Sequence, residues 1–146
     1  MKICEMLNRN QMLLEELLHV WEHSVRATHL FLSDAEVKKI KEYVPQALES
    51  VEHLIVAETE KPIAFMGIQN GRLEMLFITS EERGKGIGKQ LIQYGVKNFG
   101  IFEVTVNEQN RQAVGFYEHI GFETYRRTDF DEEGNPYPLL YMKLIQ

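Results

Sequence analysis

Apolar positions recur at helical spacing over two segments in the first third of the chain. After a short strand-like stretch at residues 2–7, apolar residues from about Gln11 recur every three or four positions, which predicts an amphipathic helix. A second helix is predicted to start at Ser33, because its Ser-Asp-Ala-Glu sequence has the spacing of a capping box. Pro45 lies inside this second pattern and is expected to kink or split the helix, since proline has no N–H to donate.

From residue 53 onwards the apolar pattern changes to the period of strands. Residues 53–58, 63–68 and 72–79 are strand-like, and short turn sequences separate them. Asn70-Gly71 is a strong hairpin signal, because a type I′ turn needs positive φ at both central positions. The three segments therefore predict an antiparallel meander.

The second half of the chain alternates between helix and strand. A helix of about three turns that ends near Phe99 is predicted before a strand at 101–106. Asn110 is the expected N-cap of another helix, and Gly121 is its expected C-terminal stop. Two last strands are predicted at 122–128 and 137–144. The order is β-α-α-β-β-β-α-β-α-β-β, which predicts one α/β (α+β) domain over residues 1–146. Its mixed sheet has about seven strands, flanked on both faces by about four helices.

Composition and charge narrow the classes of partner. Hydrophobic residues make up 44% of the 146 positions and charged residues 26%, as in soluble globular proteins. The net charge of −6 disfavours nucleic-acid binding and weakly favours amine partners. No stretch approaches the roughly 20 apolar residues that span a bilayer, and the N-terminus lacks the apolar run of a signal peptide. We therefore expect a cytoplasmic protein without nucleic-acid or membrane partners.

Cysteine and histidine do not form a recognisable metal pattern. The single cysteine, Cys4, cannot form an internal disulfide, which favours a reducing compartment. His19 and His23 have the i,i+4 spacing that can bind a metal ion on a helix, but no third ligand accompanies them. No metal site is predicted.

Three glycines alternate in a turn between a predicted strand and a predicted helix. Residues 83–88, Arg-Gly-Lys-Gly-Ile-Gly, can bend tightly and present successive backbone N–H groups at a helix N-terminus, as phosphate-binding loops do. The dinucleotide fingerprint fails because it needs glycine where Lys89 or Leu91 stands, and the P-loop fails because Gln90 replaces its hydroxyl. The alternative is a surface turn whose glycines only permit unusual backbone angles.

A second motif stands at residues 106–122. It carries every specified position of V-N-x-x-N-x-x-A-x-x-F-Y-x-x-x-G-F, while Arg83, Gly86 and Gly88 match R-x-x-G-x-G. With these two motifs the chain resembles the GCN5-related N-acetyltransferases (the GNAT superfamily) over essentially its whole length, and region 21–32 is similar to a bacterial branch of that family. The resemblance implies the GNAT acyl-CoA N-acyltransferase fold.

The resemblance also implies an activity and a cofactor site. Members of the family transfer an acetyl group from acetyl-CoA to a primary amine by direct attack, without a covalent enzyme intermediate. Positions that match the family's cofactor-binding segments are Leu76, Phe77, Ile78, Arg83, Gly84, Lys85, Gly86, Ile87, Gly88, Lys89, Asn110, Ala113, Phe116 and Tyr117. Among them, the Leu76 N–H is the expected donor to the thioester oxygen.

Three residues are candidates for proton transfer. Tyr117 matches the tyrosine that serves as general acid in many members, and a phenol is protonated at neutral pH; the alternative is an amphipathic core tyrosine. Glu74 is the first candidate for the base that deprotonates the amine, because strand alternation would place it on one face with Leu76 and Ile78. His29 is the second candidate, and its alternative is a structural histidine.

The acceptor amine is open at this point: it could belong to a small molecule or to a protein. A non-catalytic module that binds acetyl-CoA or CoA for regulation is the alternative to an enzyme, although a phenol beside the sulfur favours catalysis. A homodimer is possible, as in relatives.

Overall fold

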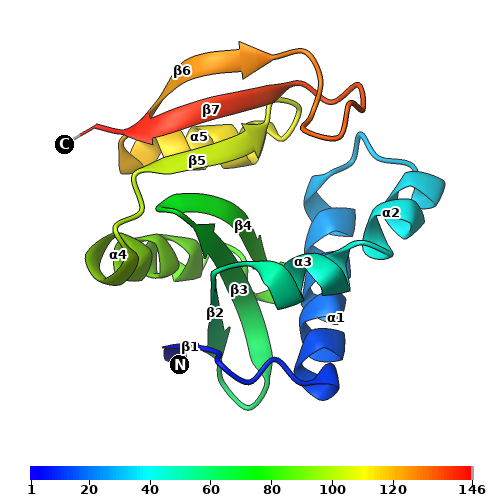
Figure 1. Cartoon of the computed structure of the whole chain (residues 1–146), viewed down its shortest axis with the longest axis vertical. Helices are drawn as coiled ribbons and strands as arrows, with labels where there is room; N and C mark the ends of the chain where they lie inside the picture. Colours follow the sequence, from blue (N-terminus) through cyan, green and yellow to red (C-terminus); the bar gives the residue numbers. More distant parts are fainter. Residues whose placement is uncertain (146) are drawn as a thin grey trace.

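A computed structural model describes residues 1–145, which form a seven-stranded sheet, five α-helices and one 3₁₀ turn (Figure 1). The strands are β1 (Lys2–Glu5), β2 (His53–Glu58), β3 (Pro62–Gln69), β4 (Arg72–Ile78), β5 (Glu103–Asn107), β6 (Phe122–Thr128) and β7 (Leu139–Leu144). The helices are α1 (Gln11–Thr28), α2 (Asp34–Lys41), α3 (Val44–Ser50), the 3₁₀ turn η1 (Ser80–Glu82), α4 (Ile87–Phe99) and α5 (Arg111–Ile120). No helix within residues 1–145 is long and apolar enough to cross a membrane.

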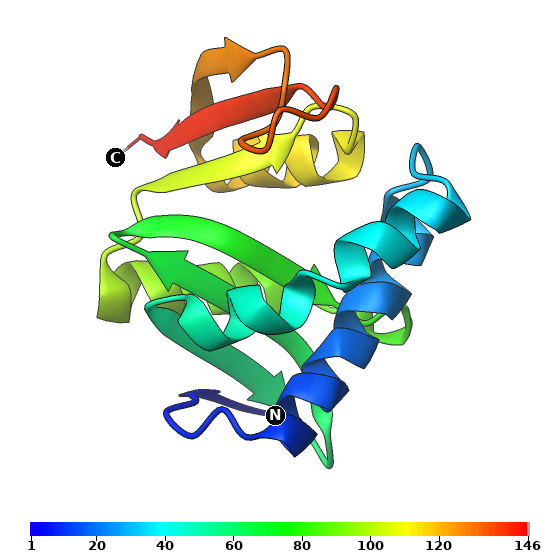
Figure 2. The same ribbon diagram turned by 45° about the vertical axis from the view of Figure 1, so that its right-hand side comes forward.

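The predicted mixed α/β sheet is confirmed, and its strand order divides it into two antiparallel groups. The order is β1-β2-β3-β4-β5-β7-β6, and the parallel pair β4–β5 joins the groups at the middle. Figures 1 and 2 show β1 to β4 in one part of the molecule and β5 to β7 in the other. Strands β1 and β6 are the sheet edges; dimer formation stays a prediction.

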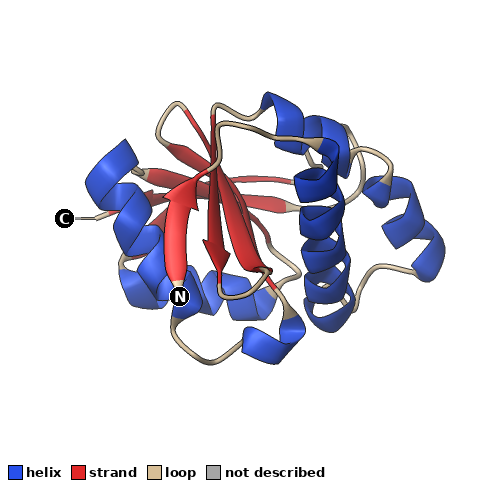
Figure 3. Cartoon of the chain, turned by 90° about the horizontal axis from the view of Figure 1, so that it is seen from below, coloured by secondary structure: helices blue, strands red, loops and turns tan. Residues whose placement is uncertain are grey.

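Helices cover both faces of the sheet, as Figure 3 shows. Helices α1 to α3 bury Leu17, Trp21 and Leu48 in a core shared with β2 and β3. Helices α4 and α5 bury Leu91 and Tyr117 in a second core on the opposite face. The sheet therefore separates two apolar cores, and the functional groups described below lie where it opens between them.

The predicted second helix is two helices. Its start is a true capping box, in which the Glu36 N–H donates to Ser33 Oγ (3.1 Å) and the Ser33 N–H donates to Glu36 Oε1 (2.8 Å). It ends at Lys41, and α3 starts again at Val44 with Pro45 in its first turn, where a missing N–H costs no helical bond. Pro45 thus splits the pattern.

Two strand boundaries differ from the predictions at the chain ends. The first strand stops at Glu5, and the last begins at Leu139 instead of residue 137. Tyr137 belongs to the preceding loop, where its N–H donates to the Asn135 carbonyl (2.7 Å). Its backbone is therefore used by a turn and not by the sheet.

Strands β4 and β5 pair at one end and then diverge. Within the described chain they pair only at Arg72 with Glu103 and at Leu73 with Val104. Beyond these positions β4 pairs with β3 alone and β5 with β7 alone. The sheet is therefore split along its middle, with one free backbone edge on each side of the opening.

Strand β4 carries a bulge beside Glu74, and the predicted placement of Glu74 on one face with Leu76 and Ile78 stays a prediction. Ile68 pairs with Leu73 but the preceding Gly67 pairs with Met75, so Glu74 is an extra residue. Leu73 accordingly packs into the same core as Leu76 and Ile78, which strict alternation forbids. Glu74 is thereby placed at the point where the strands separate.

Candidate functional site

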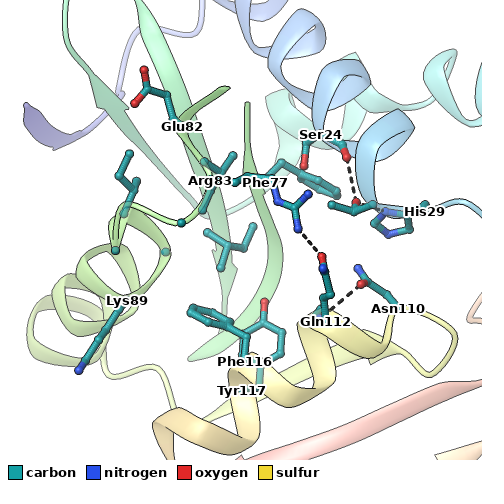
Figure 4. Close-up of a pocket in the computed structure, with 18 residues that line it drawn as sticks. Ser24, His29, Phe77, Glu82, Arg83, Lys89, Asn110, Gln112, Phe116 and Tyr117 are labelled. Atoms are coloured by element: carbon teal, nitrogen blue, oxygen red, sulfur yellow. Dashed lines mark hydrogen bonds between the residues drawn. The ribbon is translucent and has the colours of Figure 1, made fainter. Parts of the chain in front are cut away.

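A cavity of about 390 Å³ lies where the split sheet meets α4, α5 and the end of α1 (Figure 4). Strand β4 supplies one wall, the glycine turn after η1 supplies the second, and α5 supplies the third. Every residue predicted for cofactor binding lines it except Lys85: Leu76, Phe77, Ile78, Arg83, Gly84, Gly86, Ile87, Gly88, Lys89, Asn110, Ala113, Phe116 and Tyr117. Two motifs far apart in sequence thus meet around one space.

The glycine turn has the backbone conformation that its sequence indicated. Gly84 and Gly86 have φ of 80° and 79°, in the left-handed region where glycine is favoured. A Cβ on either would meet no atom within 4 Å, so the angle and not crowding favours glycine there. Gly86 is the N-cap of α4 and has no capping side chain, which leaves the first N–H groups of this 13-residue helix free for an anion.

Gly88 has a different reason to be glycine. A Cβ there would lie 3.0 Å from Phe116 Cζ and 3.2 Å from Ile78 Cδ1. The absence of a side chain lets the first turn of α4 approach both α5 and β4. Gly88 thus keeps the walls of the cavity close together.

Cationic side chains of the turn point in different directions. Arg83 reaches across the mouth of the cavity and donates to the Gln112 side chain on α5 (Figure 4). Lys85 instead donates to Glu82 Oε2 at 2.9 Å and does not line the cavity. The structure therefore does not bring Lys85 to the predicted site, because Glu82 neutralises it at the surface.

The free edge of β4 presents backbone groups to the cavity. The Thr79 N–H donates to the Ile63 carbonyl (2.9 Å), and Leu76 stands opposite Met66. Hydrogen bonds between antiparallel neighbours use every second residue, so the N–H groups of Leu76 and Ile78 point away from β3. They face the opening between β4 and β5, where an extended ligand could continue the sheet.

Tyr117 lies at the bottom of the cavity on α5. Its ring is buried between Phe116 and Phe122, at centroid distances of 5.3 and 5.7 Å, and its hydroxyl points into the cavity (Figure 4). Burial raises the pKa of the phenol above its ordinary value. The hydroxyl therefore stays protonated at neutral pH and can donate a hydrogen bond.

A smaller cavity of about 190 Å³ adjoins the first and is lined by both β4 and β5 where the two strands separate. Tyr117, Asn110 and His29 line both cavities, whereas Glu74 lines only the smaller one. Glu74 is an exposed residue, but neighbouring protein partly desolvates its carboxyl and raises its pKa, and the Glu132 carboxylate raises it further. Asn110 Oδ1 also accepts from the Ala113 N–H (3.3 Å), which confirms its predicted N-cap role.

His29 stands at the junction of the two cavities, directly after α1. Its ring lies 6.4 Å from the ring of Phe77 and 5.4 Å from that of Phe31. Burial lowers the pKa of the imidazole to about 4, so the ring is neutral at neutral pH. A neutral histidine that lines the same cavities as the Tyr117 phenol can accept a proton from a ligand bound there.

A loop from the other end of the chain closes over this region. The ring of Tyr137 lies 6.2 Å from that of Phe31, and the Tyr137 hydroxyl donates to the Glu36 carboxylate on α2. Phe77, His29, Phe31 and Tyr137 therefore form a continuous line of rings, of which Phe77 and His29 line the smaller cavity.

Sequence reasoning missed four polar residues of the larger cavity, one of which is Glu82 of η1. Ser24 and Thr28 come from the last turns of α1, and Gln112 from the first turn of α5. The i,i+4 spacing of Ser24 and Thr28 could have shown that they share a helix face. It could not have shown that this face meets the split sheet. Within residues 1–145 no three His, Cys, Asp or Glu side chains are grouped to hold a metal ion.

Comparison with known proteins agrees with this geometry. The model of the acetyltransferase (GNAT) domain family matches residues 20–144. A peptidyl-lysine N-acetyltransferase YjaB of Salmonella typhimurium is 40% identical over 86% of this chain and 88% of its own.

Solved structures show the same fold. The solution structure of the apo-form of YjaB from Escherichia coli superposes with a TM-score of 0.88 at 35% identity, covering 99% of this chain and 97% of its own. The PaiA N-acetyltransferase of Thermoplasma acidophilum, crystallised with coenzyme A, has a TM-score of 0.70 at 23% identity, with 98% and 99% covered. The split sheet, the glycine turn, the buried tyrosine and these likenesses together show that the chain belongs to the GNAT acetyltransferases and is an N-acetyltransferase that uses acetyl-CoA.

Proposed function

We propose that the acceptor is the ε-amino group of a lysine in a protein or peptide, the substrate class that the YjaB relatives are named for. The observation that carries the proposal is the meeting of the two cavities at His29 and Tyr117. The larger cavity fits the arm of acetyl-CoA. The smaller is lined by the rings of His29, Phe77 and Tyr117 and by Glu74, whose carboxylate suits an ammonium on an aliphatic stem.

The cofactor would be held mainly by backbone. N–H groups at the start of α4 would bind the diphosphate, with Arg83 leaving Gln112 to pair with it. The arm would lie along the free edge of β4, so that the Leu76 N–H donates to the thioester oxygen. A fixed donor to a developing oxyanion contributes about 10²–10³ in rate.

The transfer would be direct. The entering ammonium first loses one proton to solvent. The neutral amine nitrogen then bonds to the acetyl carbon, the carbon–sulfur bond breaks, and the Tyr117 hydroxyl gives its proton to the leaving sulfur. His29 Nε2 takes the proton that the nitrogen loses, and solvent later restores both groups. We favour His29 over Glu74 for this step because His29 also lines the cavity that holds the thioester, whereas Glu74 would attract the incoming ammonium.

We further propose that the protein works in the cytoplasm, where its single free cysteine, Cys4, stays reduced.

A peptide acetylation assay tests the proposed acceptor. The protein is incubated with acetyl-CoA and either a lysine peptide, the same peptide with its lysines replaced by arginine, or free polyamines, while CoA thiol release is followed. We expect release with the lysine peptide alone, and mass spectrometry should locate the acetyl group on the ε-nitrogen. Transfer to polyamines but not to lysine peptides would overturn the proposal.

The catalytic assignment needs a matched pair of variants. Tyr117→Phe removes the hydroxyl at the cavity, whereas Tyr94→Phe removes one on α4 that lines neither cavity. Only Tyr117→Phe should abolish the enzymatic thiol release. Equal activity in both variants would remove the phenol from the reaction.

A further inference from the structure

We propose that Thr28 is a positioning residue that holds the His29 ring in the tautomer with its proton on Nδ1, so that Nε2 is free to accept the proton of the acceptor amine. The proposal deepens the proposed function and rests on it for the role of Nε2. The assignment of the tautomer rests on the hydrogen bonds alone.

The hydrogen bonds around Thr28 allow one consistent arrangement. Thr28 Oγ1 lies 2.8 Å from the Ser24 carbonyl oxygen and 2.7 Å from His29 Nδ1. A carbonyl oxygen can only accept, so the single proton of the Thr28 hydroxyl goes to Ser24. The hydroxyl oxygen must then accept from the ring, which requires a proton on Nδ1.

The other tautomer satisfies fewer groups. With the proton on Nε2, Nδ1 could only accept, and the Thr28 hydroxyl would have to turn away from Ser24 to reach it. One hydrogen bond would be lost at a partly buried position. With the proton on Nδ1, both hydrogen bonds are kept: the Thr28 hydroxyl donates to the Ser24 carbonyl, and the ring donates to the Thr28 oxygen. Ser24 and Thr28 belong to the last turns of α1, which hold this arrangement in place.

The opposite side of the His29 ring carries the nitrogen, Nε2, that makes no hydrogen bond within residues 1–145. The ring neighbours are the aromatic side chains of Phe31 and Phe77. The ring lines both cavities. A neutral imidazole with a bare Nε2 can accept a proton from the amine nitrogen as its bond to the acetyl carbon forms, whereas an Nε2–H would present a donor and could not.

Two substitutions separate this role from a structural one. Thr28→Val keeps the shape of the side chain and removes the hydroxyl, while Thr28→Ser keeps the hydroxyl. We expect Thr28→Val to lower kcat for a lysine peptide about tenfold, with little change in KM for acetyl-CoA, and Thr28→Ser to restore most of it. Thr124→Val, an exposed position on β6 outside both cavities, is the matched control.

The tautomer itself is measured by NMR on the full chain labelled with ¹⁵N-histidine. The two ring nitrogens of a neutral histidine have well-separated shifts, and the His29→Gln variant identifies the His29 signals by their loss. We expect the protonated nitrogen of the wild-type ring to be Nδ1, and the Thr28→Val spectrum to shift toward the Nε2–H form, with Thr28→Ser like wild type.

The two readouts distinguish the possible failures. An Nε2–H ring in the wild type, or an unchanged spectrum in a folded Thr28→Val variant, overturns the role of Thr28 whatever the activity. A different outcome is a ring that is in the Nδ1–H form in the wild type and loses it in Thr28→Val, while the protein acetylates no lysine peptide. That result supports the hydrogen-bond assignment and overturns the proposed acceptor. Loss of activity in Thr28→Val without a change of tautomer also contradicts the inference.

Discussion

The cofactor side and the acceptor side of the split sheet are built in opposite ways. The cofactor side comes from two contiguous motifs, the turn at residues 83–88 and the helix after Asn110, and offers mostly backbone donors. The acceptor side combines the end of α1, the bulge on β4 and the loop before β7, and offers mostly side chains.

This difference separates a shared task from a selective one. A diphosphate and a pantetheine arm are the same in every reaction of the family, and backbone N–H groups bind them whatever the side chains are. An acceptor is selected by charge, width and proton transfer, which only side chains can tune. Substitutions on the two sides should therefore change different kinetic constants.

The largest expected effect is on the cofactor side, from Gly86→Asp. It would add a carboxylate where the diphosphate should bind and a Cβ at a φ of 79°, so KM for acetyl-CoA should rise about 100-fold or more. Gly100→Asp, at the other end of α4 with a φ of 65° and similar open space, is the control. Both variants should lose about 1–2 kcal/mol of stability, but only the first should lose affinity. Normal acetyl-CoA binding by Gly86→Asp in calorimetry would refute the assignment of the turn.

On the acceptor side, Glu74→Gln should raise KM for a lysine peptide about tenfold and leave KM for acetyl-CoA unchanged. Burial and Glu132 raise the pKa of the Glu74 carboxyl, so its ionisation opposes folding at neutral pH. The variant should therefore show a slightly higher Tm together with weaker acceptor binding. Glu123→Gln on β6 is the control, and a parallel rise of both KM values would mean that Glu74 does not distinguish the two sides.

The stability of the acceptor side should depend on pH through His29. Its pKa of about 4 in the folded protein is below the ordinary value of 6.5, so the unfolded chain binds more protons between these values. The stability that comes from keeping this ring neutral is therefore fully present above about pH 6.5 and is lost as the pH falls toward 4. The free energy of unfolding, measured with urea, should fall between pH 7 and pH 5 by about 1–2 kcal/mol more in the wild type than in His29→Gln. Equal differences in the two proteins would contradict the buried, neutral state of the ring.

The smallest expected effect comes from the contact between the two walls of the cofactor cavity. Gln112→Ala frees Arg83 from its hydrogen bond, so KM for acetyl-CoA should fall about twofold, because that bond no longer competes with the diphosphate. Gln109→Ala, in the turn before α5, is the matched control. An increase in KM would show instead that Gln112 itself binds the cofactor.

Local patterns predicted much of the fold. The Ser33 capping box, the Asn70-Gly71 turn and the helix stop at Gly121 each depend on neighbouring residues, and each stands where it was predicted. The end of the first strand and the start of the last were misplaced, since turn hydrogen bonds such as that of Tyr137 compete with strand pairing and leave no apolar signal.

The sequence by itself determined the glycine turn and, in a separate segment, the N-cap at Asn110 with Tyr117 on the helix that follows, because each feature arises from backbone angles and helix spacing within its own segment. Only the tertiary structure decided that a bulge interrupts β4 beside Glu74, that Lys85 pairs with Glu82 outside the cavity, and that Thr28 and His29 line it. These outcomes depend on strand register and on contacts between segments distant in the chain, and neither can be predicted from the local sequence.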